Sequence, residues 1–233
     1  MVCRMVIAVG EFRVNHLLDG FRLMAMNRNE KHEHNKNDIG FVHGDGWGIV
    51  SGKLGKLELY KKEVACWNDP KYHHYYNVDM DFAILHARRA SPGTPVEYSF
   101  THPFEKNGWY FCHNGTINDF KSKGRSDSEQ FFSIILDNLR QHGDAKEAIK
   151  KRVNQVKKYT ALNFILSDKN KAYILEKYRQ SPEYYTMKYL QNKKYVIVSS
   201  EVLPNFEAEW GKIANNFIVE LDIIGREIVT FTC

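Results

Sequence analysis

The stretch from Leu85 to Gly115 constrains the fold of this chain more than any other part of the sequence. Two apolar and aromatic segments, residues 81–86 and 109–112, have the composition of β-strands. The connection between them is rich in Pro, Gly, Thr and Ser, and connections of this length are often functional. The second segment ends at Asn114-Gly115, a pair that tolerates positive φ and is typical of a tight turn. The sequence therefore predicts a strand, a long loop, a second strand and a turn.

The polar residues of this stretch have ordinary structural interpretations as well as a functional one. Taken alone, the arginine pair at residues 88–89 favours solvated side chains leaving a strand. Residues 114–115 favour a hairpin turn, and residues 102–103 favour a rigid corner of the loop. Taken together, a pair of arginines and an amide beside a glycine suit a site for a carboxylate and an oxyanion.

Hydrophobic periodicity divides the rest of the chain into strands and amphipathic helices. Residues 3–9 are apolar and β-branched, which predicts a buried first strand. Apolar residues spaced by three and four over residues 14–24 predict a helix. Residues 27–38 are expected to form a polar surface loop, and residues 66–79, rich in His and Tyr, an irregular segment. The other predicted elements are hairpins of residues 48–51 with 54–62 and 161–166 with 172–178, a basic helix over 145–158, and strands over 195–199, 217–223 and 228–231.

The start of a helix is predicted at Ser126, which precedes an apolar segment. A Ser followed three residues later by a Glu, here Glu129, is the pattern of a capping box. This start places Asp127 in the first helical turn, where the helix dipole favours a carboxylate.

No metal or other cofactor is expected from the sequence. His32 and His34 lie in the polar segment, but no Cys or carboxylate cluster stands at ligand spacing near them, which favours solvated side chains. The glycine-rich segment His43–Ile49 has neither a GK[ST] ending nor GxGxxG spacing, so it does not have the pattern of a phosphate-binding loop. It predicts instead a close approach of the backbone at the start of a strand.

The composition is that of an ordinary soluble globular protein. The 233 residues are 43% hydrophobic and 26% charged. No linker, repeat or low-complexity segment divides them, so residues 1–233 are expected to form one domain of mixed α and β structure with a real core. The net charge of +5 indicates only weak affinity for anions.

The sequence also bears on location and partners. No apolar run reaches eighteen residues, and the first residues lack the pattern of a signal peptide, so no membrane span or secretion is expected. The four cysteines form no CxxC pair, which favours reduced thiols in a cytoplasm. We expect neither a nucleic-acid nor a membrane partner, and the sequence is compatible with a homo-oligomer.

Seven short motifs stand in order along the chain from Cys3 to Glu201. They are Cys3-Arg4-Met5, Asp45-Gly46-Trp47-Gly48-Ile49, His86-Ala87-Arg88, Thr101-His102-Pro103-Phe104, His113-Asn114-Gly115, Ser126-Asp127-Ser128-Glu129 and Ser199-Ser200-Glu201. In this order and spacing the chain resembles the class II glutamine amidotransferase domains of the N-terminal nucleophile (Ntn) hydrolase superfamily, and among these the stand-alone amidotransferase-like proteins. The resemblance implies an α+β fold, a four-layer αββα sandwich of two antiparallel sheets between helical layers.

The resemblance also implies the chemistry, which is hydrolysis of the glutamine side-chain amide to glutamate and ammonia. Cys3 would attack the amide carbon and form a γ-glutamyl thioester, with its own α-amino group as the base. The Asn114 side chain and the Gly115 backbone N–H would hold the oxyanion.

Substrate recognition by three further residues is implied in the same way. Arg88 would bind the α-carboxylate of the substrate with its planar fork. Asp127 would pair with the α-ammonium group, and His102 would shape the pocket.

The sequence departs from the family pattern before the nucleophile. Met1 and Val2 precede Cys3, whereas the family nucleophile becomes the first residue when the initiator methionine is removed. Removal of Met1 alone would leave the nitrogen of Cys3 in a peptide bond, where it is not a base. Either both residues are removed, or Cys3 uses another base, or turnover is impaired.

Three functions therefore stay open from the sequence. The first is glutamine hydrolysis that supplies ammonia to an unknown acceptor, and the second is hydrolysis of a γ-glutamyl amide or peptide on the same scaffold. The third is a non-catalytic regulatory subunit that keeps the fold. Because no synthase domain is recognised in the sequence, an ammonia acceptor is expected on a separate synthase or peptidase subunit.

Overall fold

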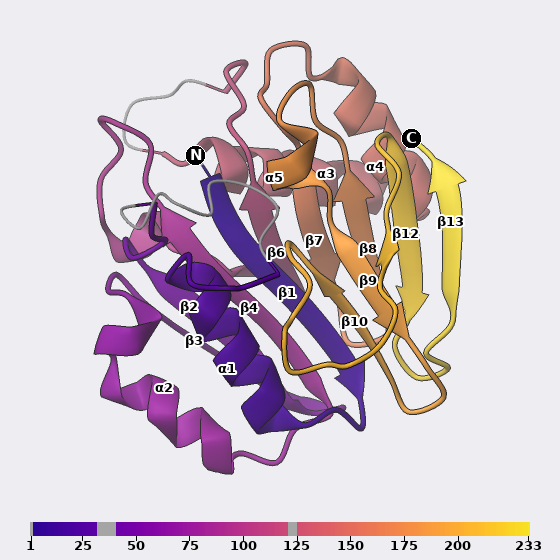
Figure 1. The fold of residues 1–233 in the computed structure, drawn as a ribbon. Coiled ribbons are helices and arrows are strands. Elements are labelled where there is room, and N and C mark those ends of the chain that lie inside the picture. The colour runs from indigo at the N-terminus through magenta and orange to yellow at the C-terminus, as the bar shows by residue number, and fades with distance from the viewer. Residues whose placement is uncertain (1, 32–40, 121–124) are drawn as a thin grey trace.

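The computed structural model describes residues 2–31, 41–120 and 125–233. In this part of the chain two antiparallel sheets, one of seven strands and one of six, stack face to face. Helices cover the outer face of each sheet (Figure 1). The expected α+β fold with four αββα layers is therefore confirmed.

The elements have the following bounds. The strands are β1 (Val2–Gly10), β2 (Trp47–Lys53), β3 (Lys56–Lys62), β4 (Phe82–Arg89), β5 (Phe104–Lys106), β6 (Trp109–Asn114), β7 (Asn163–Ser167), β8 (Lys171–Glu176), β9 (Lys188–Gln191), β10 (Tyr195–Ser199), β11 (Gly211–Lys212), β12 (Phe217–Asp222) and β13 (Ile228–Thr232). The helices are α1 (Val14–Ala25), α2 (Pro70–His74), α3 (Asp127–His142), α4 (Ala145–Gln155) and α5 (Pro182–Tyr185). The first sheet has the order β11-β9-β10-β1-β4-β2-β3 and the second β13-β12-β8-β7-β6-β5.

The two faces of the first sheet pack against different layers. On β1, Val6 and Ala8 belong to the core cluster that contains the apolar face of α1. Met5 and Ile7 belong instead to the cluster between the sheets. Because successive side chains of a strand point to opposite faces, Cys3 faces the second sheet together with Met5 and Ile7.

The same alternation fixes the faces of β4 and β6. On β4, Phe82 and Ile84 lie between the sheets, so Arg88, which is of the same parity, faces the second sheet. On β6, Phe111 packs on the α3 side and Cys112 lies between the sheets. Asn114 follows Cys112 by two residues, so it also faces the space between the sheets.

Most of the predicted elements are present with bounds shifted by a few residues. The first strand, the helix α1, the hairpins β2–β3 and β7–β8, the helix α4 and the strands β10, β12 and β13 all occur where the sequence predicts them. Residues 32–40, which include the two histidines of the polar segment, lie outside the described residues.

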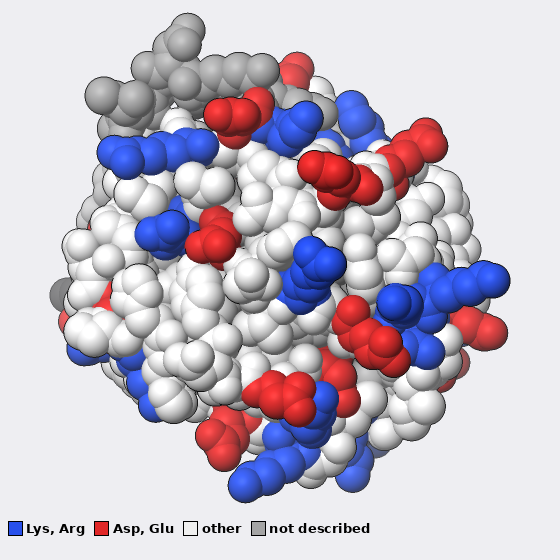
Figure 2. Space-filling model, turned by 60° about the horizontal axis from the view of Figure 1, so that its bottom comes forward, with Lys and Arg blue, Asp and Glu red and all other residues white. Residues whose placement is uncertain are grey.

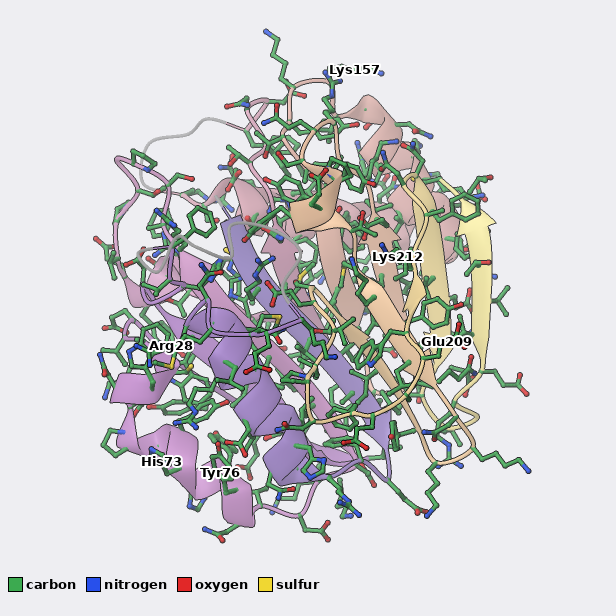
Figure 3. The ribbon with its side chains drawn as sticks, in the orientation of Figure 1. Arg28, His73, Tyr76, Lys157, Glu209 and Lys212 are labelled. Carbon is green, nitrogen blue, oxygen red and sulfur yellow. The ribbon has the colours of Figure 1, made fainter. Side chains whose placement is uncertain are left out.

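The prediction of an irregular segment at residues 66–79 is wrong. This segment contains α2 between two short 3₁₀ turns. Asp69 accepts a hydrogen bond from the Lys71 backbone N–H at 3.1 Å, and Pro70 follows as the first helical residue, which is a favourable helix start. The Tyr76 hydroxyl donates to Asp19 of α1 at 2.6 Å, so the segment belongs to the outer helical layer, where Figure 3 shows His73 and Tyr76.

The prediction of a tight turn at Asn114-Gly115 is also wrong. The hairpin turn lies earlier, at Asn107-Gly108, where both residues have positive φ, 56° and 77°. It joins β6 to the short strand β5, which the sequence analysis assigned to the long loop. Asn114 ends β6 without a hairpin, because β6 pairs with β5 on one side and with β7 on the other.

The capping box at Ser126 is not formed, although the helix α3 does begin at Asp127. The Ser126 side chain makes no capping hydrogen bond, and Glu129 pairs with Arg125 instead, at 2.5 Å. The local sequence pattern therefore predicted the position of the helix start but not the contacts that stabilise it.

The described surface carries charges of both signs. On the face shown in Figure 2, Lys and Arg side chains are interspersed with Asp and Glu, so the net charge of +5 does not form a basic patch there. Of the helices in the described residues, none is long and apolar enough to cross a bilayer.

Candidate active site

Cys3 lies where β1 extends beyond the end of its neighbour β10. Pairing with β10 starts at Val6, whereas pairing with β4 starts at Val2. The N–H and C=O groups of Cys3 are satisfied by side chains instead of a strand. Its N–H donates to Oδ1 of Asn114 at 2.8 Å, and its C=O accepts from the Tyr184 hydroxyl at 3.1 Å. Three segments that are distant in the sequence therefore meet at the main chain of Cys3.

Arg88 is the cross-strand partner of Cys3 on β4. The backbone N–H and C=O of Arg88 bond to Gly46 and Asp45 on the β2 side, so the pair with Cys3 is a non-hydrogen-bonded pair. In such pairs the Cα atoms lie closest, about 4.5 Å apart in a regular sheet, and so do the side chains. Both side chains also face the second sheet, so this register brings the thiol and the guanidinium together.

The arginine pair taken alone favours solvated side chains, and for Arg88 this interpretation is wrong, because its side chain is 0% exposed. Its guanidinium donates to the carbonyl oxygens of Pro95 at 2.9 Å and Asp45 at 3.4 Å, and its Nε has no partner among the described residues. Burial lowers the pKa of Arg88, and the nearby Cys3, Asp45 and Asp127 oppose this effect. No carboxylate within the described residues forms an ion pair with it. A buried cation held only by neutral carbonyls can bind an anion strongly.

Asn114 and Gly115 present hydrogen-bond donors beside Cys3. The Oδ1 atom of Asn114 is occupied by the Cys3 N–H, which directs the amide nitrogen Nδ2 away from it. In the described part of the chain, neither Nδ2 of Asn114 nor the backbone N–H of Gly115 donates to a protein acceptor. Gly115 has φ 147°, and a Cβ there would overlap the carbonyl oxygen of Ala161, so the position requires glycine. These two donors can stabilise an oxyanion that forms next to the thiol.

Asp127 is the first residue of α3, as the sequence predicts, and its carboxylate is anchored by backbone groups. Its Oδ2 accepts from the Ile117 N–H at 2.7 Å and its Oδ1 from the Ser128 N–H at 2.8 Å. A carboxylate has about four acceptor positions, so it keeps capacity for a further donor. Its charge raises the pKa of Cys3 in addition to the larger effect of burial, which places it electrostatically within the site.

His102 is buried in a stack of aromatic rings. Its ring centroid lies 4.3 Å from that of His86, and also 4.3 Å from that of Phe104. Neither ring nitrogen of His102 has a hydrogen-bond partner among the described residues. Burial holds its pKa well below the ordinary value, and His86 acts in the same direction. This surrounding suits a neutral ring that supports the wall of the site, and a direct contact with substrate stays a prediction.

The Cys3 thiol is protonated at neutral pH in this structure. Burial raises its pKa to about 11, and the positive charge of Arg88 only partly offsets this. Cys112, which also faces the space between the sheets, has a pKa raised well above its ordinary value by burial. A thiol becomes a strong nucleophile only as the thiolate, so Cys3 needs a base.

Three further residues surround the site, and none of them was among the residues predicted from the sequence. Tyr184 contacts the Cys3 carbonyl, and Asn163 on β7 is the cross-strand partner of Asn114. Glu176 is buried at the end of β8, where it accepts a hydrogen bond from Asn163 at 3.3 Å. In the sequence, Asn163 and Glu176 lie near the ends of β-rich segments, which is only a weak indication of a functional role. No sequence pattern indicated a role for Tyr184.

The described residues contain no group of three or more His, Cys, Asp or Glu side chains that could hold a metal ion. The arrangement itself supplies several reactive and binding groups. It comprises a buried thiol, two donors beside it without an acceptor among the described residues, a cation that pairs with no carboxylate among them, and an anchored carboxylate.

Comparison with known proteins identifies related sequences. The sequence model of a family described as glutamine amidotransferases class-II matches residues 31–181. A γ-glutamyl-hercynylcysteine sulfoxide hydrolase of Mycobacterium tuberculosis is 30% identical over 79 residues, which are 34% of this chain and 34% of that protein. The chain thus matches about a third of the length of this curated relative.

Solved structures share the fold over nearly the whole chain. Glutamine phosphoribosylpyrophosphate amidotransferase from Bacillus subtilis, complexed with ADP and GMP, superimposes with a TM-score of 0.69 and 17% identity. The alignment covers 99% of this chain and 49% of that one. A glutamine aminotransferase class-II domain protein from Silicibacter pomeroyi gives 0.61 and 16% identity, with 99% of both chains covered. At these identities the likeness concerns the fold, which is that of the Ntn-type amidotransferases.

Proposed function

This chain belongs to the class-II glutamine amidotransferases, and we propose that it hydrolyses the side-chain amide of glutamine through a thioester on Cys3, giving glutamate and ammonia. The observation that supports this most is Arg88. Its guanidinium is fully buried beside Cys3, and no carboxylate among the described residues pairs with it. A buried charge is costly unless it is paired, so a substrate carboxylate bound there would both offset this cost and hold the substrate next to the nucleophile.

The proposed reaction has two halves. In the first, Sγ of Cys3 attacks the amide carbon and gives its proton to the base, which is the α-amine when Cys3 is the first residue. Nδ2 of Asn114 and the N–H of Gly115 hold the oxyanion, the C–N bond then breaks, and the proton leaves with ammonia. In the second half a water molecule attacks the thioester, and glutamate and the free thiol are released.

Substrate entry requires the cover over the site to open. Cys3 and Arg88 are both 0% exposed, and the carbonyl of Pro95 occupies part of the Arg88 fork. A substrate carboxylate would replace this neutral carbonyl with a charged acceptor, and charge-assisted hydrogen bonds are roughly twice as strong as neutral ones. Binding of the α-carboxylate therefore provides the free energy to displace the segment that carries Pro95.

A second candidate function is hydrolysis of a larger γ-glutamyl compound. The similarity to a γ-glutamyl-hercynylcysteine sulfoxide hydrolase over 79 residues favours it. Arg88 and Asp127 would recognise the same γ-glutamyl group in either substrate, so they do not discriminate between the two functions. The leaving group does, because it is ammonia in one reaction and a larger amine in the other.

One experiment separates these candidates. The intact mass of the natively produced protein is measured to identify its first residue, and glutamate release is then followed from glutamine and from γ-glutamyl dipeptides. A higher kcat/KM for glutamine supports the glutaminase, and a higher value for the dipeptides supports the γ-glutamyl hydrolase. If neither compound is hydrolysed by a form that begins at Cys3, the proposed function is wrong and a non-catalytic role is favoured.

Labelling with an electrophile that mimics glutamine should identify the nucleophile. We expect a diazo-ketone analogue of glutamine to alkylate Cys3 and none of the other cysteines, because only Cys3 lies beside Arg88 and the two free donors. The rival is Cys112, which faces the same space. Burial raises the pKa of both thiols, so the choice between them rests on the groups beside Cys3. Peptide mapping reads out the label, and excess glutamine should protect Cys3. Label on Cys112 would contradict the assignment.

The variant Arg88→Lys should separate binding from chemistry. It keeps the charge but loses the planar fork. The KM for glutamine should therefore rise roughly ten- to hundredfold, which corresponds to a lost charged hydrogen bond of about 1.5–3 kcal/mol. The change in kcat should be smaller. Arg89→Lys is the matched control, because the Arg89 guanidinium lies over the Phe41 ring at 3.9 Å. Steady-state kinetics of both variants give the answer. A fall in kcat at unchanged KM would show that Arg88 does not bind the ground-state substrate.

A further inference from the structure

Tyr184 is a buried residue of the short helix α5 whose hydroxyl contacts the main chain of Cys3. The hydroxyl donates to the Cys3 carbonyl oxygen at 3.1 Å, across 181 positions of sequence. Figure 1 shows α5 beside the N-terminal end of β1. We infer that Tyr184 is a positioning residue for the nucleophile, one that fixes the backbone of Cys3 without contacting the substrate. This inference deepens the proposed function and rests on Cys3 as the nucleophile.

The contact compensates for a missing strand. At Val6 and beyond, β1 is paired with β10, but at Cys3 this neighbour has already ended. The carbonyl of Cys3 therefore points to a side where no strand partner exists, in a region where Cys3 is 0% exposed. Buried carbonyl groups are almost always hydrogen-bonded in native structures. Without the Tyr184 hydroxyl, the peptide that carries the nucleophile would lose its anchor on this side.

The ring of Tyr184 is itself held by a buried ionic pair. The guanidinium of Arg4 lies 4.0 Å from the ring centroid and donates to the Tyr184 carbonyl oxygen at 3.3 Å. Arg4 in turn forms an ion pair with Glu201 at 2.6 Å, and Glu201 accepts from Asn29 at 2.8 Å. These side chains lie on the helical side of the first sheet, opposite the thiol. They hold the tyrosine on the face of the sheet opposite the thiol, so they do not occupy the side that substrate would enter.

His43 determines how the Tyr184 hydroxyl uses its single proton. Its Nε2 lies 3.0 Å from the hydroxyl oxygen, and its Nδ1 lies 3.3 Å from the carbonyl of Ala25. Burial holds the pKa of His43 well below its ordinary value, and Arg4 acts in the same direction, so the ring is neutral. A tyrosine that donates to Cys3 alone must accept from Nε2–H of this ring. This tautomer leaves Nδ1 unprotonated beside the Ala25 carbonyl, which accepts instead from the His43 backbone N–H at 2.8 Å. The opposite tautomer would draw the tyrosine proton to His43 and release the Cys3 carbonyl.

The helix α5 is also anchored to the strands that carry the oxyanion donors. The carbonyl of Tyr185 accepts from Nδ2 of Asn163 at 2.7 Å, and Asn163 is the cross-strand partner of Asn114. Just after the helix, the backbone N–H of Met187 donates to Glu176 at 3.0 Å. Through Tyr184, Cys3 is therefore connected to β7 and β8, and β7 pairs with the strand that carries Asn114. Loss of the hydrogen bond between Tyr184 and Cys3 should misalign the thiol and the oxyanion donors.

The variant Tyr184→Phe tests the inference through kinetics. It removes the hydroxyl and keeps the ring, so kcat is expected to fall roughly ten- to hundredfold, because a misplacement of about 1 Å can cost that much. The KM for the substrate should stay within about twofold, because Arg88 and Asp127 are unchanged. Tyr178→Phe is the matched control, since it removes a hydroxyl that lies 3.1 Å from Thr186 and does not contact Cys3. An unchanged kcat in Tyr184→Phe, even with a lowered Tm, would reduce Tyr184 to a structural role and overturn the inference.

A nuclear magnetic resonance measurement tests the contact itself. The sequence contains a single Cys-Arg step, Cys3-Arg4, so protein labelled with carbonyl-¹³C cysteine and ¹⁵N arginine gives one carbonyl-to-amide cross-peak. The Cys3 carbonyl resonance should move in Tyr184→Phe and stay in place in Tyr178→Phe. If it stays in place in both, the hydrogen bond is absent and the inference is wrong. If the form that begins at Cys3 hydrolyses neither glutamine nor a γ-glutamyl dipeptide, the proposed function fails and Tyr184 positions no nucleophile. If that form is active and Tyr184→Phe leaves its kcat unchanged, the inference alone is refuted.

Discussion

A form of the protein that begins at Cys3 is expected to hydrolyse its substrate roughly 10²–10⁴ times faster than a form that retains Val2, the usual contribution of a general base. With Val2 in place, the nitrogen of Cys3 is a peptide N–H that donates to Asn114 at 2.8 Å. Its lone pair is delocalised, so it cannot accept the thiol proton. A free α-amine has an ordinary pKa of about 7.7–8.0, so it can accept a proton near neutral pH.

The thiol itself makes the base necessary. Burial raises the pKa of Cys3 to about 11, so at pH 7 the unprocessed form contains very little thiolate. The thiolate fraction rises with pH until the pH exceeds this pKa, so residual activity of the unprocessed form should increase steadily between pH 7 and pH 10. The form that begins at Cys3 should instead reach its plateau once the α-amine is deprotonated. The two pH profiles therefore distinguish an assisted thiol from an unassisted one.

The experiment releases a Cys3 terminus from a cleavable fusion and compares glutamate production with forms that begin at Met1 and at Val2. Mass spectrometry verifies each first residue. Equal rates in all three forms would show that the α-amine is not the base. A nearby histidine would then have to be considered, but His86 has its pKa lowered to about 3 and His113 to about 4, mainly by burial. Bases this weak are poorly suited to removing a proton from a thiol.

The sequence allowed the fold and the grouping of the candidate site residues to be predicted, because their signals are local or lie in ordered motifs. The apolar run of the first strand and the spacing in α1 reflect burial on a single face, and the structure contains both elements. The position of Asp127 at a helix start followed from the residues around it. The closeness of Cys3, Arg88 and Asn114 was implied by family resemblance, and the strand register now gives its physical reason.

The features that sequence analysis missed depend on contacts between distant segments. Tyr184 lies in a helix of four residues and acquires its role only because β10 ends before Cys3. Both Asn114-Gly115 and Asn107-Gly108 fit the pattern of a hairpin turn, and only the strand pairing shows that the second forms it. Taken alone, the arginine pair favoured a solvated Arg88, because nothing in the pair indicates the segment that covers it. Local propensity could not decide these cases.

Asn114→Ala is expected to lower kcat by roughly 10²–10³-fold, the usual cost of removing one oxyanion donor, with little change in the KM for the substrate. The structure gives Asn114 two contacts with different consequences. Its Oδ1 accepts from the nitrogen of Cys3 at 2.8 Å, and its Nδ2 has no acceptor within the described residues. The alanine variant removes both contacts, so a second variant is needed to assign the loss to the donor.

Asn114→Asp provides this separation. It keeps an oxygen that can accept from Cys3 and replaces the donor with a second oxygen, which would repel a developing oxyanion. We therefore expect kcat to fall at least as far as in Asn114→Ala. Asn138→Ala is the matched control, because Asn138 is a fully buried asparagine of α3 whose amide donates to Ala148 at 3.0 Å, away from Cys3. This control variant should have a lower Tm, but its kcat should be unchanged at temperatures where it is folded. If Asn114→Asp kept most of the wild-type kcat while Asn114→Ala lost it, the anchor on Cys3 would be the important contact, and the oxyanion would have to be stabilised by other donors.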